Sequence, residues 1–299
     1  MLNIAWSPRF NHPLPDGHRF PMEKYDLVPE QLIREGTVAE SQFFEPVMLR
    51  DPVYQVHTEV YIEQLINQTL PPKEVRRTGF PLSKELVERE FHIMDGSCQA
   101  GLFALEYGVA CNMAGGTHHA FADRGEGFCL FNDAAVCIQF LMDKGLISKA
   151  MVVDLDVHQG NGTAHMFGDH ASVFTFSMHG KNNFPARKEV SSLDIPLEDG
   201  TDDAAYLKIL GEVLPKVFDE VEPDFVFFNS GVDVLESDKI GKLSLSLQGC
   251  KDRDRMVFER CKKYKIPVVA AMGGSYSWKL ADIIEAHANT FRTIQDIYF

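Results

Sequence analysis

Five short apolar runs, separated by stretches with a helical pattern, constrain the fold of this chain more than any other feature of its sequence. The runs lie within residues 108–119, 150–162, 172–180, 224–233 and 266–276. We expect helices at residues 132–143, 202–220, 250–264 and 278–291. Apolar strands that alternate with helices are typical of a parallel sheet covered on both faces. The sequence therefore predicts an α/β protein with a central parallel β-sheet and helices on both faces.

Each apolar run ends with side chains that can take part in catalysis or binding. These are His118 and His119, Asp156 and His158, His179, Asp233, and Tyr276. The carboxyl ends of parallel strands meet at one edge of a sheet, which is where open α/β sheets bind ligands. Five such endings in one chain favour a shared site. His179 has the weakest claim, and we expect it to be a loop histidine outside the site.

Composition and charge exclude several classes of protein. The 299 residues contain no linker, repeat or low-complexity tract, so we expect one domain over residues 1–299. The net charge of −14, without a basic stripe, argues against nucleic acid or an anionic membrane as partner. No run is long enough to span a membrane. The six cysteines lack CxxC spacing, which indicates free buried thiols and a cytoplasmic location.

Two longer stretches, residues 68–84 and 179–203, carry no clear pattern, and we expect irregular loops there.

The segment VVDLDVHQGNGT, residues 152–163, points to a metal ion. Alternate residues of a strand face the same side, so Asp156 and His158 can reach one ion, and Asp233 can add a third ligand from a neighbouring strand. Three protein ligands with an open position are typical of catalytic zinc. Oxygen-rich ligands also suit Fe²⁺ or Mn²⁺. The alternative for the motif alone is a solvated strand end.

Two further motifs have a catalytic and a plain interpretation. The adjacent histidines His118 and His119 follow two glycines and could supply a base and a proton donor, or could be surface residues of a turn. Tyr276 follows Gly273 and Gly274 and could donate a hydrogen bond to an oxyanion, or could simply close a loop. Asp154 lies deeper in its apolar run than Asp156, and a buried carboxylate there needs a partner.

Taken together, these motifs resemble the zinc-dependent histone deacetylase family, with its arginase-like fold. The resemblance rests on GGTHHAFADRGEGFCLFNDA, VVDLDVHQGNGT, NSGVDVLESDKIGKLSLS and GGSY, and extends from about residue 5 to residue 276. The early HRFPMEKY, with HHAFADRG and DVLESDKIGKLS, is most similar to the class IV branch and its bacterial relatives.

The resemblance implies a role for each matched residue. Asp156, His158 and Asp233 would bind Zn²⁺, with Fe²⁺ as an alternative. His119 would be the general base and His118 its electrostatic and proton-donating partner. Asp154 would hold His118, Asn161 would hold His119, and Tyr276 would bind the carbonyl oxygen. The residues that would contact substrate in a narrow acyl-lysine tunnel are Gly127, Phe128, Phe184, Ile240 and Gly274, although core packing is the plain interpretation of both phenylalanines.

The resemblance also implies a structural potassium ion. Its ligands would be Asp154, Ser177 and backbone carbonyls of Asp156, His158 and Met178. Asn161 departs from the class I pattern, which has aspartate there, and agrees with classes II and IV. This difference would change how His119 is tuned.

Several functions are compatible with the sequence. The leading one is a metal-dependent hydrolase that removes acetyl or longer acyl groups from lysine side chains of proteins or peptides. The alternative is a deacetylase of small amides such as acetylpolyamines, which acidic residues at the tunnel rim would favour. A non-catalytic acyl-lysine binder would not need the full set of motifs. A binuclear ureohydrolase needs a second carboxylate two residues after Asp233, where the chain has Leu235. The sequence does not reveal the oligomeric state.

Overall fold

One sheet of eight parallel strands forms the centre of the molecule. The computed structural model describes all residues from 1 to 299. The strands are β1 Asn3–Ala5, β2 Phe43–Phe44, β3 Val109–Asn112, β4 Ala150–Asp154, β5 Val173–Gly180, β6 Leu193–Leu197, β7 Phe225–Ser230 and β8 Val268–Met272. Their order across the sheet is β2-β1-β3-β8-β7-β4-β5-β6. The predicted α/β class with one central parallel sheet is confirmed.

The four adjacent strands β3, β8, β7 and β4 occupy the middle of the sheet. Every residue of these four strands is buried. Their register aligns Ala110 with Val269, Val269 with Phe227, and Phe227 with Val152. Side chains that follow the carboxyl ends of these strands therefore emerge close together.

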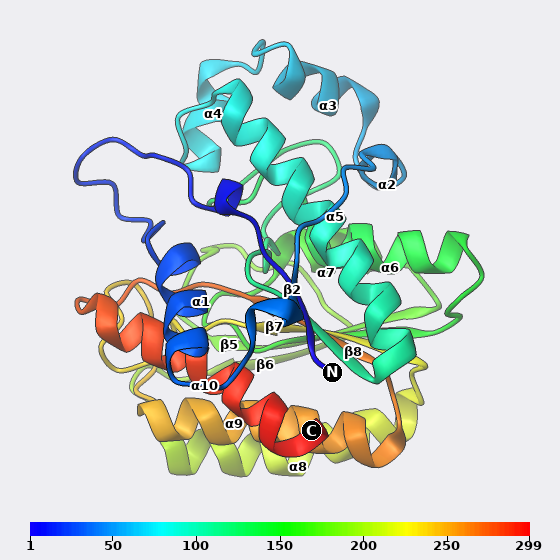
Figure 1. Cartoon of the computed structure of the whole chain (residues 1–299), viewed down its shortest axis with the longest axis vertical. Helices are drawn as coiled ribbons and strands as arrows, with labels where there is room; N and C mark the ends of the chain where they lie inside the picture. Colours follow the sequence, from blue (N-terminus) through cyan, green and yellow to red (C-terminus); the bar gives the residue numbers. More distant parts are fainter.

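Helices cover both faces of the sheet. They are α1 Lys24–Arg34, α2 Asp51–Tyr54, α3 Glu59–Ile66, α4 Pro72–Thr78, α5 Lys84–Tyr107, α6 Asp133–Asp143, α7 Asn161–Phe167, α8 Asp203–Val221, α9 Leu247–Tyr264 and α10 Leu280–Tyr298. Figure 1 shows α5 and α6 on one side of the sheet and α8, α9 and α10 on the other. None of the helices combines the length and the apolar character needed to cross a bilayer.

All five strands and four helices expected from the sequence are present, but the prediction of irregular loops in two stretches is wrong. The stretch 68–84 contains α4, and the stretch 179–203 contains β6. The longest helix, α5, was not expected. It begins at the cap Ser83, whose Oγ accepts a hydrogen bond from the Leu86 amide at 3.1 Å, and ends at Gly108 with a φ of 88°.

Candidate active site

Asp156, His158 and Asp233 meet at the centre of this sheet edge. Asp156 and His158 follow β4, Asp233 follows β7, and the two strands are hydrogen-bonded neighbours. His158 Nδ1 lies 3.1 Å from Asp156 Oδ1 and 3.1 Å from Asp233 Oδ2. Ligand atoms around one tetrahedral zinc lie ~3.4 Å apart at ordinary bond lengths. The three side chains are therefore brought together with a spacing close to that of ligands to one ion.

Backbone amides hold the carboxylates of this group in place. The Gly274 amide donates to Asp156 Oδ2 at 2.8 Å, and the Val157 amide donates to Asp233 Oδ1 at 2.9 Å. These contacts leave Asp156 Oδ1 and Asp233 Oδ2 directed at His158. Outer hydrogen bonds of this kind fix the orientation of metal ligands.

The electrostatics of the group favour a cation. Burial opposes ionisation of Asp156, but the charges of His118 and His158 outweigh it and hold the pKa of Asp156 well below its usual value. Burial and the charge of Asp156 raise the pKa of Asp233 to about 7. Two buried carboxylates this close repel each other unless a positive charge lies beside them. A divalent ion held by these residues would supply that charge, and the oxygen, oxygen and nitrogen donors suit Zn²⁺, Fe²⁺ or Mn²⁺.

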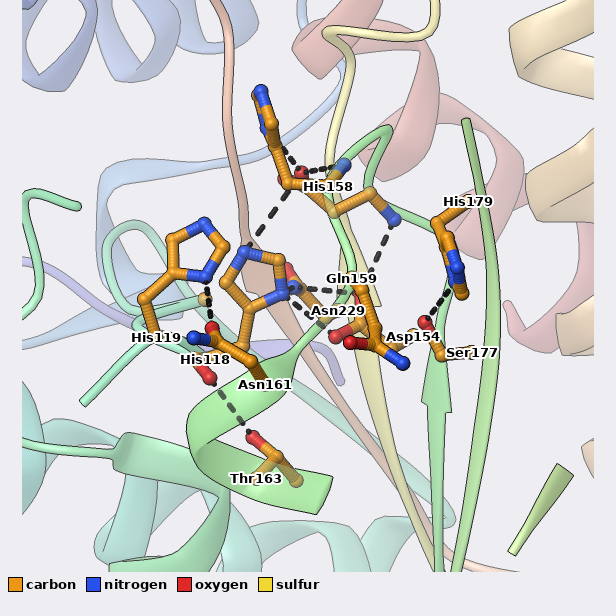
Figure 2. A network of polar contacts seen from close by, with 12 residues as sticks. His118, His119, Asp154, His158, Gln159, Asn161, Thr163, Ser177, His179 and Asn229 are labelled. Atoms are coloured by element: carbon orange, nitrogen blue, oxygen red, sulfur yellow. Dashed lines mark hydrogen bonds and ion pairs between the residues drawn. The ribbon is translucent and has the colours of Figure 1, made fainter. Parts of the chain in front are cut away.

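The adjacent histidines lie beside this group, and each has its own partner. His118 Nδ1 lies 2.7 Å from Asp154 Oδ2, and His119 Nδ1 lies 2.6 Å from Asn161 Oδ1. The two rings are 4.1 Å apart at their centroids. Figure 2 shows the two pairs side by side, below His158. Both predicted pairings are present, and the surface-turn interpretation is wrong because both histidines are buried.

The hydrogen bonds of His119 define which of its nitrogens is available. Asn161 Nδ2 donates to Glu126 Oε2 at 3.3 Å, which turns Asn161 Oδ1 toward His119. An amide oxygen can only accept, so His119 carries its proton on Nδ1 and has a free lone pair on Nε2. Burial, with the charges of His118 and His158, holds the pKa of His119 well below its usual value. His119 is therefore neutral and able to accept a proton.

Tyr276 completes the site from the loop after β8. Burial raises the pKa of Tyr276 well above its usual value, so its hydroxyl stays protonated and can donate. The loop passes tightly against the segment that carries the histidines. Gly116 has a φ of 64°, and a Cβ there would lie 2.6 Å from the Cα of Gly273. Only glycines allow this backbone contact.

Two adjoining cavities lead to these residues. The inner cavity, of about 40 Å³, is lined by residues that include Lys24, Asp156, Asp233, Gly274 and Tyr276. The outer cavity, of about 510 Å³, is lined by residues that include Arg19, Arg77, Glu126, Phe184, Ile240 and Lys242. His119, Gly127, Phe128, His158 and Tyr276 line both. Every substrate-contacting residue implied by the resemblance therefore borders one of the two cavities.

The chain matches known proteins over most of its length. A sequence model described as the histone deacetylase domain matches residues 18–291. Histone deacetylase 2 of Arabidopsis thaliana is 32% identical over an alignment that covers 89% of this chain and 72% of that protein.

The chain belongs to the histone deacetylase family. An uncharacterised protein of Picosynechococcus sp. is 40% identical over 99% of both chains. The crystal structure of an HDAC homologue from Aquifex aeolicus has the same fold, with a TM-score of 0.83, 24% identity, and coverage of 98% of this chain and 83% of that one. This histone deacetylase homologue is accordingly an amide hydrolase, in a family that is generally metal-dependent.

The sequence did not single out three buried residues that brace the site of this histone deacetylase homologue. Lys24 Nζ donates to the Gly273 carbonyl at 2.9 Å and to Ser275 Oγ at 3.1 Å. Asn229 Nδ2 donates to Asp154 Oδ1 at 3.0 Å. The third residue, Arg253 of α9, reaches the segments that carry the metal-binding group.

Arg253 ties the ends of β4 and β7 together. Its Nη1 donates to the Leu155 carbonyl at 3.1 Å and to the Gly231 carbonyl at 2.5 Å. Leu155 precedes Asp156, and Gly231 lies two residues before Asp233. Asp254 Oδ1 accepts from Arg253 Nη2 at 2.7 Å, which balances the buried charge. One guanidinium therefore sets the spacing between the two strands that supply the ligands.

Replacing Arg253 by lysine should weaken metal binding without removing a ligand. Lysine keeps the positive charge but lacks the planar fork that contacts the two carbonyls through Nη1 and Asp254 through Nη2 at the same time. Loss of such a support typically costs about 10- to 100-fold in metal affinity. A competition titration with a chelator measures this. Arg255→Lys is the matched control, because Arg255 contacts Asp296 on the half-exposed side of the same helix. Equal affinities in the two variants would show that Arg253 does not position the ligands.

The expectation that His179 lies in a loop is wrong. β5 continues to Gly180, and His179 is 2% exposed. Its Nδ1 lies 2.9 Å from Ser177 Oγ, and burial lowers the pKa of His179 to about 4. His179 lines neither cavity. His179 contacts Ser177 behind the site. The prediction of a loop was wrong because the sequence does not reveal β6, which pairs with the end of β5.

Proposed function

We propose that the protein removes acyl groups from the ε-amine of lysine side chains, using the Asp156, His158 and Asp233 group beside His118, His119 and Tyr276. The observation that carries this proposal is the placement of Asp156, His158 and Asp233 beside His119 and Tyr276 around one narrow cavity. A zinc or Fe²⁺ ion bound there would polarise an amide carbonyl and lower the pKa of a water molecule.

The side chains divide the remaining steps between them. His119 Nε2 accepts the proton of the attacking water, while Asn161 keeps the other ring nitrogen protonated. The Tyr276 hydroxyl donates to the carbonyl oxygen as negative charge develops on it. His118, held by Asp154, stabilises the charge and returns a proton to the leaving amine. Phe128 and Phe184 flank the lysine side chain.

We also propose a structural potassium ion close to Asp154. Asp154 and Ser177 are aligned across β4 and β5, which supports their sharing one ion. Backbone carbonyls of Asp156, His158 and Met178 would complete its oxygen ligands.

A panel of peptides with matched sequences and acetyl-, lactyl- or myristoyl-lysine tests the proposed function. We expect the metal-loaded protein to hydrolyse at least one acyl peptide to the free carboxylic acid and the peptide with an unmodified lysine side chain, and to hydrolyse none after chelation. Acetylated polyamines serve as the comparison substrates. Hydrolysis of the polyamines alone would contradict the proposal.

Asn161→Asp should move the pH profile of the enzyme. A carboxylate against His119 favours the protonated ring and should raise the pKa of His119 by about 1–3 units. A general base must be neutral to act, so the acidic limb of kcat/KM should move to higher pH. Activity should fall near neutrality and recover in part in alkali. Profiles of wild type and variant, recorded on one substrate at equal metal content, measure the shift.

The structure adds a control for this prediction. The new carboxylate would face Glu126, whose Oε2 now accepts from Asn161. The double variant Asn161→Asp, Glu126→Gln removes that repulsion and keeps a donor beside residue 161. Glu126→Gln alone should keep the wild-type limb. If the limb stays in place in both the single variant Asn161→Asp and the double variant, each folded and loaded with metal, residue 161 does not tune the base.

A further inference from the structure

The outer cavity carries a charge opposite to that of the whole chain. The protein has a net charge of −14, yet three of the four charged side chains that line the outer cavity are cations, namely Arg19, Arg77 and Lys242. The fourth is Glu126. A substrate must pass these groups to reach the inner cavity.

Arg19 is the cation most available to a substrate. Its guanidinium carbon lies 4.9 Å from the centroid of the Phe128 ring, and the residue is exposed. No carboxylate of the chain pairs with Arg19, so its charge faces the cavity with only the ring beneath it. Phe128 lines both cavities, which places Arg19 at the point where a bound side chain would enter.

The backbone of Arg77 and of Lys242 is held in place by hydrogen bonds. The Arg77 carbonyl accepts from the Gly127 amide at 3.1 Å, and the Lys242 carbonyl accepts from the Gly200 amide at 2.7 Å. Arg77 pairs with Glu74 at 3.0 Å, and Lys242 lies 3.8 Å from Asp199. These side chains are 35% and 47% exposed, so water screens both pairs and a substrate carboxylate can share either cation.

Glu126 does not balance the three cations. Its Oε2 accepts a hydrogen bond from Asn161 Nδ2 at 3.3 Å, so Asn161 occupies one of its two carboxylate oxygens. The charged side chains that line the outer cavity, which we call the mouth, are therefore three cations and one carboxylate, and Arg19 is the cation that has no carboxylate partner.

We propose that this mouth selects acylated lysines flanked by acidic residues and disfavours polycationic acylamines and lysine-rich peptides. The inference rests on the proposed function and names its substrate class. Residues next to an acyl-lysine remain in the mouth while the side chain enters the narrow cavity. Acidic flanks meet Arg19, Arg77 and Lys242 there, whereas a polyamine or a basic flank places like charges together.

Three peptides that share one acetyl-lysine and differ only in acidic, neutral or basic flanks test this selection. For the metal-loaded wild type, we expect kcat/KM for the acidic peptide to exceed that for the basic peptide by on the order of 10-fold at low salt. The ratio should approach one at high salt, because exposed charges are screened. Arg19→Gln should reduce the ratio about threefold, and the triple variant Arg19→Gln, Arg77→Gln, Lys242→Gln should abolish it.

The matched control is the triple variant Lys208→Gln, Lys216→Gln, Lys263→Gln. These exposed lysines lie on α8 and α9, outside both cavities, and their loss changes the net charge equally. The control should keep the wild-type ratio. A wild-type preference for the basic peptide would overturn the proposal. So would an unchanged ratio of the two kcat/KM values in the triple variant Arg19→Gln, Arg77→Gln, Lys242→Gln.

A binding measurement separates this inference from the proposed function. Fluorescence anisotropy of the labelled peptides gives their Kd values whether or not they are hydrolysed. If no peptide is turned over, the proposed function fails, and the Kd ratio still tests the mouth. Equal affinities for acidic and basic peptides would refute the charge selection even in an active enzyme.

Discussion

Asp233→Ala, like Asp156→Ala, is expected to remove most of the bound metal and nearly all hydrolysis. Each variant leaves His158 with one carboxylate where the structure places two at 3.1 Å. A metal that polarises a carbonyl contributes several kcal/mol to catalysis, so we expect a loss of about 10³-fold or more in kcat/KM. Elemental analysis of the purified variants measures the metal, and peptide hydrolysis measures the activity.

The metal-free proteins distinguish a lost ligand from a damaged fold. Asp233→Ala also removes the acceptor of the Val157 amide, so the melting temperatures of the metal-free variant and the metal-free wild type are compared to detect a damaged fold. Asp169→Ala, in an exposed turn, is the control and should keep both metal and activity. Stoichiometric metal in both ligand variants would refute the ligand assignment.

Tyr276→Phe is expected to lower kcat by about 10²–10³-fold, the usual cost of removing one oxyanion donor. The ring packs near Phe128 and His158, and phenylalanine keeps those contacts. Only the hydroxyl is lost, so metal content and melting temperature should be unchanged. Steady-state kinetics on the best acyl-lysine substrate give kcat and KM separately.

The comparison variant for this prediction is Tyr107→Phe. Tyr107 ends α5, is 44% exposed and lines neither cavity. Its loss of a hydroxyl should leave kcat at the wild-type value. A Tyr276→Phe enzyme with near-normal kcat would mean that Tyr276 only closes the loop after β8.

The part of the fold that could be predicted is the part buried on both sides. Strands such as β4 and β7 are apolar along most of their length because helices cover both faces of the sheet. The edge strands lack this signal. β2 has two residues, and β6 contains Asp194 and Pro196 and is mostly partly exposed. Helix α5 was missed because its buried positions include polar residues, which hide the apolar periodicity.

The same reasoning explains which site residues could be found. Asp156, Asp233 and Tyr276 follow apolar strands, so topology alone brings them to one edge. Lys24 and Arg253 lie on helices and act on carbonyl groups that are 249 and 98 residues away. No local pattern marks such a contact. The charges of the mouth could not be located either, since they come from separate segments of the chain.

Because the three proposed metal ligands follow two different strands, metal binding by them would be linked to folding. His158 and Asp233 are 75 residues apart in the sequence, and α8 lies between their strands. A chain in which β7 has not yet paired with β4 offers no complete set of ligands, so an ion held by these three residues would bind the native state almost exclusively. By mass action, a metal present at 100 times its Kd then adds about 2.7 kcal/mol to the free energy of unfolding. In a cell short of metal, the same linkage would expose more of this protein to proteases and lower its abundance.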